Sequence, residues 1–305
     1  MKVAIVGFGK IARDQHVPAI AGSDAFDLAA TASRHAHAEG LPAYHDIDAL
    51  LAAEPDIPAI SLCQPPQVRH AAARAAIAAG RHVFLEKPPG ATLSEVVDLA
   101  HAADSAGVTL FASWHSRFAA AVEPARDWLD GKPIQSIRID WKEDVRHWHP
   151  DQQWIWEPGG LGVFDPGINA LSILTRLLRG PVRLESATLE FPENRDAPIA
   201  ASLAMRTTDG APIAAEFDWR QTGPQTWDIV VETDGGSLRL AEGGNRMFVD
   251  GAERSLPPES EYPALYARFA KLIAEARSDV DVAPLRLVAD AFLAGRRTVT
   301  EAFED

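Results

Sequence analysis

The sequence has little cysteine, a deficit of basic residues and no long apolar run. Cys63 is the single cysteine among 305 residues, so no disulfide forms within the chain and we expect a reducing compartment. Lysine and arginine number 29 against 43 aspartate and glutamate, giving a formal net charge of −14. An acidic surface repels phosphate backbones, which argues against nucleic-acid binding. No apolar stretch approaches the ~20 residues that cross a membrane, and the N-terminal pattern is unlike a signal peptide. We therefore expect a cytoplasmic protein without a membrane partner.

The first third of the chain alternates short apolar runs with helical patterns. The apolar runs predict strands at Val3–Val6, Phe26–Ala32, Ala59–Leu62, Val83–Leu85 and Thr109–Ala112. The patterns between them predict helices at Ile11–Ala21, Asp46–Ala53, Val68–Ala79 and Ser94–Ala106. Strands that are apolar throughout, with helices between them, indicate a parallel sheet covered on both faces. We predict a dinucleotide-binding Rossmann domain over residues 1–118.

Longer strands follow one another after residue 118. We expect them at Ser136–Glu143, Glu185–Phe191, Ala200–Arg206, Ala211–Trp219, Trp227–Thr233 and Ser237–Leu240. In the first of them Ile137, Ile139 and Trp141 share one face, an alternation typical of a half-exposed, mostly antiparallel sheet. Helices are expected at Ile168–Leu178, Tyr262–Ala276 and Leu285–Ala302. The predicted class is α/β, with an α+β substrate-binding domain over residues 119–305 that carries a large open sheet.

A glycine turn joins the first predicted strand to the first helix. It reads Gly7-Phe8-Gly9-Lys10-Ile11-Ala12, a G-x-G-x-x-A pattern. The glycines permit a tight turn and close approach of the backbone to a pyrophosphate, and the helix N-terminus offers free N–H groups. The alternative is an ordinary glycine turn. The position of the G-x-G-x-x-A segment inside a βαβ unit favours dinucleotide binding by residues 7–11.

The end of the second predicted strand selects between the two nicotinamide dinucleotides. NAD-preferring sites usually carry an acid there, which bonds the ribose hydroxyls. This chain has Ser33-Arg34-His35 and no acid. Ser33 can donate to a 2′-phosphate and Arg34 can pair with it, so we predict that NADP is accepted, alone or alongside NAD. The alternative is that Arg34 is only a solvated charge.

The segment Glu86-Lys87-Pro88-Pro89 follows the strand at 82–85. Ligands of parallel sheets bind at the carboxyl ends of the strands, which predicts that Lys87 points into such a crevice. Its ammonium would hydrogen-bond a reacting hydroxyl and stabilise developing alkoxide character. The alternative is a surface Glu-Lys pair.

These segments, together with Gly159-Gly160, Asp165 and Asn169, resemble the glucose–fructose oxidoreductase / inositol dehydrogenase / MocA family over essentially the whole chain. The resemblance implies a catalytic role for Lys87 and Asp165. It also implies cofactor contacts from the turn Cys63-Gln64-Pro65 and from Glu86. The family usually has histidine four residues after the aspartate, where this chain has Asn169, and that change removes one acid–base group.

Three further segments narrow the resemblance to a branch of bacterial L-arabinose and D-galactose 1-dehydrogenases. They are Trp141–Arg146, His147–Pro150 and Trp154–Asp165. The branch implies an NAD(P)-dependent oxidation of an aldose at its anomeric carbon to the aldonolactone. The alternatives are another sugar or a polyol such as an inositol, and a dinucleotide-binding regulator without turnover.

Residue chemistry supports a sugar site in the second domain independently of the resemblance. Period-two alternation places Glu143 on the inward face, where a carboxylate needs a partner; sugar hydroxyls or Arg146 would supply one. Asp165 and Asn169 share a helix face if both are helical, although Asp followed by Pro is also a helix N-cap pair. We expect Asp165 to take the anomeric proton and Asn169 to hold a neighbouring hydroxyl.

Aromatic residues surround His149 in the sequence. Trp148 and Trp154 are expected to stack on apolar sugar faces with His149 between them, the alternative being a tryptophan-rich core under a loop. His147 and His149 make only a weak metal pair, and no metal is expected.

The expected partner is a small-molecule sugar, and the oligomeric state stays open. The family resemblance implies a homodimer formed through the open sheet. Yet the outward positions of that sheet are charged, unlike an apolar obligate interface: Arg138, Asp140, Lys142, Glu216 and Asp218.

The sugar is expected to bind at the domain junction, where Lys87 and Asp165 would act on it together.

Overall fold

The computed structural model describes residues 1–258 and 260–304, and the chain divides into two compact units. Unit 1 comprises Met1–His115 and Glu261–Val282, and unit 2 comprises Ser116–Ser260 and Ala283–Asp305. The boundary expected after residue 118 is therefore near the point where unit 2 begins. The segment Glu261–Val282, which we had assigned to the second domain, belongs to unit 1 instead.

Unit 1 is built on a six-stranded parallel sheet with the order β3-β2-β1-β4-β5-β6. The strands are β1 (Lys2–Val6), β2 (Asp27–Ala32), β3 (Ala43–Tyr44), β4 (Ala59–Leu62), β5 (His82–Leu85) and β6 (Leu110–Ala112). The strand order reverses beside β1, which is the switch point at which such sheets bind ligands. The prediction of a Rossmann sheet is confirmed, with the two-residue strand β3 as an addition.

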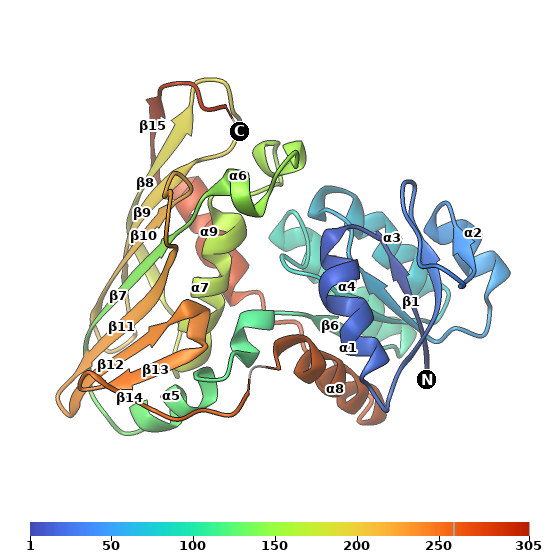
Figure 1. Cartoon of the computed structure of the whole chain (residues 1–305), viewed down its shortest axis with the longest axis horizontal. Helices are drawn as coiled ribbons and strands as arrows, with labels where there is room; N and C mark the ends of the chain where they lie inside the picture. Colours follow the sequence, from blue (N-terminus) through green and yellow to red (C-terminus); the bar gives the residue numbers. More distant parts are fainter. Residues whose placement is uncertain (259, 305) are drawn as a thin grey trace. The chain divides into compact units, whose positions relative to one another are not determined.

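Helices cover both faces of this sheet (Figure 1). They are a π-helical turn (Ala12–His16), α1 (Val17–Ala21), α2 (Ile47–Ala53), α3 (Pro66–Ala78), α4 (Leu93–Ala106) and α8 (Glu261–Ala274). Their ends follow ordinary capping chemistry. Asp46 caps α2, and Thr92 with Glu95 forms a capping box at α4, which ends at the left-handed Gly107.

Alternate strand residues explain why the returning helix α8 belongs to unit 1. Ile60 and Leu62 pack on the face covered by α2, α3 and α4. Phe84 points the other way and stacks on Tyr266 of α8, with ring centroids 5.2 Å apart, and Phe269 packs against Phe26. Because this second face is aromatic, it needs an apolar cover, and the buried stripe of α8 supplies it.

Unit 2 contains a nine-stranded sheet with the order β14-β13-β12-β11-β7-β10-β9-β8-β15. The strands are β7 (Ile134–Lys142), β8 (Arg183–Pro192), β9 (Ala200–Arg206), β10 (Pro212–Asp218), β11 (Thr226–Thr233), β12 (Gly236–Ala241), β13 (Arg246–Val249), β14 (Ala252–Glu253) and β15 (Arg296–Thr300). Only the pairs β7–β10 and β8–β15 are parallel among these described strands. The expectation of a large, mostly antiparallel sheet is confirmed.

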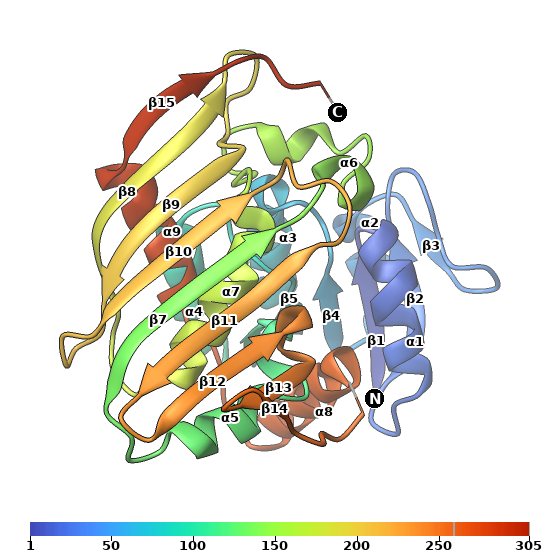
Figure 2. The same cartoon turned by 60° about the vertical axis from the view of Figure 1, so that its left-hand side comes forward.

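One face of this sheet is covered by helices and the other carries charges, as Figure 2 shows for α7 (Phe164–Leu177) and α9 (Ala283–Ala294) behind the strands. Along β7, Ile137, Ile139 and Trp141 are buried, as their alternation predicted. The opposite positions form ion pairs, for example Arg138 with Asp140 at 2.6 Å. Shorter helices are α5 (Val122–Leu129) and α6 (Val145–Trp148).

The helix expected over Leu285–Ala302 is wrong in its second half. Helix α9 ends at Ala294, and Arg296–Thr300 forms the edge strand β15 beside β8. Gly295 interrupts the helix, and the β-branched residues Thr298, Val299 and Thr300 favour an extended chain. Among the helices of the described residues, none has the length and apolar character of a membrane span.

Candidate active site

The glycine turn after β1 has the geometry that a dinucleotide requires. Gly7 has a φ of +88°, and a Cβ there would lie 2.7 Å from the backbone nitrogen of Gln64, so only glycine fits without a shift. At Gly9 a Cβ would meet no heavy atom within 4 Å, which leaves open space beside the start of the helix. Ala12, the first residue of the π-helical turn, is fully buried. The turn therefore fits a bound pyrophosphate.

The other predicted cofactor residues leave the sheet at the same edge, because they follow β2, β4 and β5 of a parallel sheet. Ser33 is held by its backbone N–H, which donates to the Tyr44 carbonyl at 2.9 Å, and Arg34 and His35 are exposed. Within the described part of the chain Arg34 makes no hydrogen bond or ion pair. Its guanidinium is thus available for an anion.

Two residues of the glycine turn have side chains that are occupied elsewhere. Phe8 is buried and packs in the protein interior, so its side chain serves packing. Lys10 forms an ion pair with Asp14 at 2.7 Å, four residues along the same helix.

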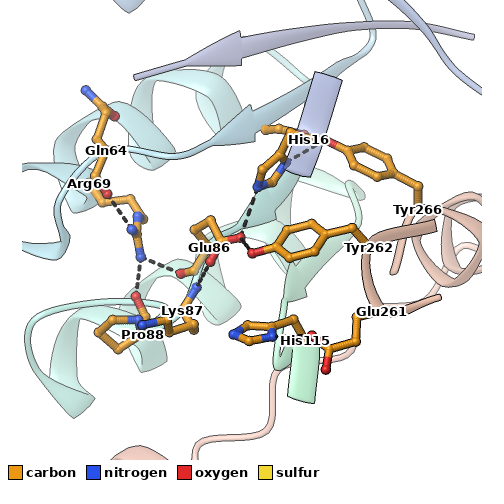
Figure 3. A network of polar contacts seen from close by, with 11 residues as sticks. His16, Gln64, Arg69, Glu86, Lys87, Pro88, His115, Glu261, Tyr262 and Tyr266 are labelled. Atoms are coloured by element: carbon orange, nitrogen blue, oxygen red, sulfur yellow. Dashed lines mark hydrogen bonds and ion pairs between the residues drawn. The ribbon is translucent and has the colours of Figure 1, made fainter. Parts of the chain in front are cut away.

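Glu86 lies at the centre of a buried polar network, drawn in Figure 3. Its Oε1 lies 2.9 Å from Nε2 of His16 and accepts a hydrogen bond from the Tyr262 hydroxyl at 2.8 Å. Its Oε2 accepts from the backbone N–H of Lys87 at 2.7 Å. Burial opposes ionisation of Glu86, but the hydrogen bond and charge of His16, aided by His115 and Tyr262, lower the pKa of this carboxyl to about 2.

His16 carries the matching positive charge. Its Nδ1 lies 2.8 Å from the Tyr266 hydroxyl, which in turn lies 2.9 Å from the Ser61 hydroxyl. Burial alone would lower the pKa of His16, but Cys63, Tyr266 and Glu86 raise it well above its ordinary value of 6.5. The His16–Glu86 contact is therefore an ion pair enclosed in the protein.

A second buried cation fastens the two loops that follow β4 and β5. Arg69 of α3 donates to the backbone carbonyls of Gln64, Glu86 and Pro88. The turn at Cys63–Pro65 and the turn that carries Lys87 are thus held by one guanidinium, as Figure 3 shows. A charged group bonded to three carbonyls fixes both loops relative to the sheet.

In unit 2, Asp165 and Asn169 lie on one helix face, as expected. Helix α7 begins at Phe164 with Val163 as its N-cap, so Asp165 is in the first turn and the N-cap alternative is wrong. Asp165 is buried, and its Oδ2 lies 3.5 Å from Nε2 of His149. Asn169, one turn later, is half-buried, and its side chain makes no hydrogen bond to any described residue.

Glu143 faces inward, as the alternation predicted, and holds two indoles. Its Oε1 accepts from Nε1 of Trp219 at 3.3 Å and its Oε2 accepts from Nε1 of Trp227 at 2.9 Å. Arg146, the partner that the alternative interpretation named, donates to Asp144 at 2.9 Å. Trp219 also packs against His149, with centroids 5.5 Å apart. Glu143, Trp219, His149 and Asp165 therefore form one continuous cluster, which we call the acid–histidine cluster.

The two predicted tryptophans lie at the border of this cluster. Trp154 donates to Oε1 of Gln152 at 3.2 Å, and the same oxygen lies 3.5 Å from Nδ1 of His149. Trp148 is partly exposed and donates to Gln225 at 3.3 Å, while its ring lies 5.3 Å from that of Trp227. No group of three His, Cys, Asp or Glu side chains arranged to hold a metal occurs in residues 1–258 and 260–304.

Sequence reasoning missed the residues that hold these groups in place. Arg69, His16, Tyr262, Trp219 and Gln152 were not singled out. His16 had a weak signal, since it lies four residues after Ala12 on the buried face of its helix. Tyr262 and Trp219 bond carboxylates 176 and 76 residues away, which no local pattern reveals. Arg69 and Gln152 bond residues 2 to 19 positions away, but in loops that carry no periodic pattern.

Comparison with known proteins extends this picture. Residues 1–113 match the family model described as "Oxidoreductase family, NAD-binding Rossmann fold" (Gfo/Idh/MocA). The galactose 1-dehydrogenase of Pseudomonas fluorescens is 46% identical over 310 residues, which cover 100% of this chain and 99% of that protein. The chain belongs to the Gfo/Idh/MocA oxidoreductase family.

Solved structures of related proteins agree with this membership. The D-galactose-1-dehydrogenase of Rhizobium etli is 61% identical, with a TM-score of 0.95 over 99% of this chain and 97% of that one. A 3-ketoreductase of Actinomadura kijaniata, solved with NADP and TDP-benzene, has a TM-score of 0.85 over 98% and 99% of the two chains. At 18% identity, the latter likeness concerns the fold alone.

As a Gfo/Idh/MocA member the protein is an NAD(P)-dependent oxidoreductase. The nicotinamide supplies hydride transfer when the cofactor is bound. The glycine turn, the Ser33–His35 segment and the loops fastened by Arg69 are the parts of unit 1 that fit such a cofactor. Lys87 belongs to unit 1, whereas Asp165, Asn169 and the rest of the acid–histidine cluster belong to unit 2.

Proposed function

We propose that the protein oxidises D-galactose, L-arabinose or both at the anomeric carbon, with NADP or NAD as hydride acceptor and the aldonolactone as product. The observation that carries the proposal is the acid–histidine cluster, found in a chain 61% identical to a D-galactose-1-dehydrogenase. A buried carboxylate beside an imidazole is suited to removing a hydroxyl proton. The two sugars share their configuration at C2, C3 and C4, so one pocket accepts both.

The reaction breaks two bonds of the cyclic sugar. The C1–H bond breaks with its electron pair, which leaves as hydride to the nicotinamide. The O–H bond of the 1-hydroxyl breaks as its proton goes to a protein base, and the carbonyl of the lactone forms at C1. The protein thus needs one group that accepts a proton and others that hold the ring.

Asp165 is the base that we assign to the 1-hydroxyl proton. His149, 3.5 Å away, is placed to share that proton with it. Lys87 is assigned to a reacting hydroxyl, where its ammonium would stabilise developing negative charge. Asn169 offers its carboxamide to a neighbouring hydroxyl.

The tryptophan indoles give the cluster its selectivity for a sugar. Their flat apolar rings suit the apolar face of a pyranose, while Gln152 and His149 offer polar partners for hydroxyls. Glu143 holds the fully buried indole of Trp219, which packs against His149, and the indole of Trp227, which packs against Trp148.

An absorbance assay at the reduced-nicotinamide band tests the proposal. The purified full chain is mixed with NADP or NAD and with D-galactose, L-arabinose, D-glucose or myo-inositol. We expect turnover with D-galactose or L-arabinose at least tenfold above the other two. Preference for the inositol or for D-glucose would instead identify a different polyol or sugar dehydrogenase.

A Lys87→Ala variant serves as control against a contaminating dehydrogenase, because its turnover should fall severely while the protein stays folded. Dinucleotide binding without reduction by any aldose would contradict the proposal and favour a regulatory protein.

A further inference from the structure

The Glu86 carboxylate connects three segments of unit 1 that are far apart in sequence. His16 comes from the π-helical turn after the glycine turn, Tyr262 comes from α8, and the Lys87 backbone comes from the loop after β5. Glu86 is 3% exposed and His16 is fully buried. All of the donors converge on the two oxygens of one side chain (Figure 3).

This arrangement exceeds what the burial of a core residue requires. An apolar residue at position 86 would fill the same space. A buried ion pair is not in itself a source of stability, so stability alone does not account for a carboxylate here. The carboxylate also bonds the backbone N–H of the residue that follows it. Its position therefore sets the direction in which the Lys87 side chain leaves the main chain.

We propose that Glu86, held by His16 and Tyr262, is a positioning residue for Lys87. The inference rests on the role proposed above for Lys87. The contact with His16 ties the lysine loop to the helix that begins at the glycine turn, and Arg69 ties the same loop to the turn after β4. The main chain from which the Lys87 side chain departs is thereby fixed relative to both cofactor-binding segments.

Substitution of Glu86 by glutamine isolates this role, because it keeps the size of the side chain. The carboxylate accepts hydrogen bonds at both oxygens, whereas a carboxamide has one oxygen and one NH₂ group. The NH₂ group would face either the Lys87 N–H or protonated His16, and the N–H group that it faces loses its acceptor. His16→Gln removes the positive charge that pairs with Glu86 and leaves residue 86 itself unchanged.

Matched controls exist in the same unit. Glu54 accepts from the Tyr44 hydroxyl at 2.8 Å, and His70 pairs with Asp98 at 2.8 Å. Glu54→Gln and His70→Gln therefore remove the same kinds of contact away from Lys87. We expect both controls to behave as the unsubstituted protein.

The first readout is independent of activity. The full-length protein is treated with a limiting amount of an amine-acetylating reagent, and acetylation of Lys87 relative to the exposed Lys271 is followed by peptide mass spectrometry. We expect the Lys87 rate to change at least threefold in Glu86→Gln and in His16→Gln. An unchanged rate in both folded variants would overturn the proposal.

The second readout is whether the substitution changes kcat or the KM for the sugar. With the best aldose, we expect kcat to fall at least tenfold in Glu86→Gln while the KM for the sugar stays within threefold. A kcat within twofold of the unsubstituted enzyme would overturn the positioning role. If the unsubstituted protein oxidises no aldose, the proposed function fails, and the acetylation rates alone decide this inference.

Tyr262→Phe covers the case in which the first two variants do not fold. It removes one hydrogen bond to Glu86 and keeps the ion pair. We expect a smaller change in Lys87 acetylation in the same direction, with Tyr44→Phe as control. No difference between these two phenylalanine variants would count against the proposal.

Discussion

Nε2 of His149 lies 3.5 Å from Oδ2 of Asp165, in the first turn of α7. The chain has asparagine at position 169, one turn along the same helix, where members of the family usually have histidine. An imidazole therefore still accompanies the aspartate, but it comes from the segment after α6. The pairing makes Asp165 the residue on which the proposed proton transfer depends most.

Asp165→Asn should lower kcat by about 10²- to 10⁴-fold, the usual contribution of a general base. An amide cannot accept the hydroxyl proton, although it fills the same space. Steady-state kinetics with the preferred aldose measures the effect, and circular dichroism checks the fold. Asp209→Asn, at an exposed position of unit 2, is the control. A loss below threefold would show that Asp165 is not the base.

Glu143→Gln should destabilise unit 2 by roughly 1–3 kcal/mol, because one of the two indole N–H groups loses its acceptor in a buried place. The free energy of unfolding in urea, followed by tryptophan fluorescence, measures this change. The exposed Glu232 accepts a single bond from the Ser237 hydroxyl, so Glu232→Gln is expected to change stability by less than about 0.5 kcal/mol. Equal effects of the two substitutions would contradict the role of Glu143.

Arg34→Ala should raise the KM for NADP about tenfold and leave the KM for NAD within twofold. A charge-assisted hydrogen bond to the 2′-phosphate is worth about that factor, and NAD has no such phosphate. The measurement is the KM for each dinucleotide at saturating sugar. Arg254→Ala, at an exposed position of unit 2, should alter neither value. A parallel rise for both cofactors would exclude recognition of the 2′-phosphate by Arg34.

The His16–Glu86 pair predicts how stability changes with pH. The lowered pKa of Glu86, about 2, means that its contribution is present above its ordinary value of 4.5 and is lost as the pH falls through 2. The raised pKa of His16 means that its contribution is present below 6.5 and is lost as the pH rises through the folded-state pKa. As the pH rises above 7, the Tm should therefore fall more steeply in the unsubstituted protein than in His16→Gln. Parallel curves would show that His16 is neutral in the folded protein.

Local patterns predicted the longer strands of both sheets, because burial of one or both faces of a strand produces a recognisable pattern of apolar residues, but they missed β3, β13, β14 and β15. The runs at Ala59–Leu62 and Ala200–Arg206 coincide with β4 and β9. The edge strand β15 was mistaken for helix because its polar, half-exposed residues follow a helical run without a clear signal besides Gly295. Short edge strands such as β14 carry too few residues to show a period.

The candidate site was predictable where a motif is contiguous and not where it depends on the fold. The glycine turn and Glu86-Lys87-Pro88 are adjacent residues with a chemical reason for their order. The side-chain partners of Glu86 are 70 and 176 residues away in the sequence. Those of Glu143 are 76 and 84 residues away. Their assembly is decided by which face of a sheet α8 covers and by the pairing of β7 with β11, and sequence spacing does not contain that information.

The central claim is that hydride leaves the anomeric carbon of an aldose. D-Galactose with deuterium at C1 tests it directly. The full-length protein is incubated with this sugar and the oxidised cofactor, and both products are analysed by mass spectrometry. We predict that the reduced cofactor gains one deuterium, that the product is a lactone without deuterium, and that kcat falls if hydride transfer limits the rate. A reduced cofactor without deuterium, together with a product that keeps it at C1, would place the oxidation at another carbon and contradict the account.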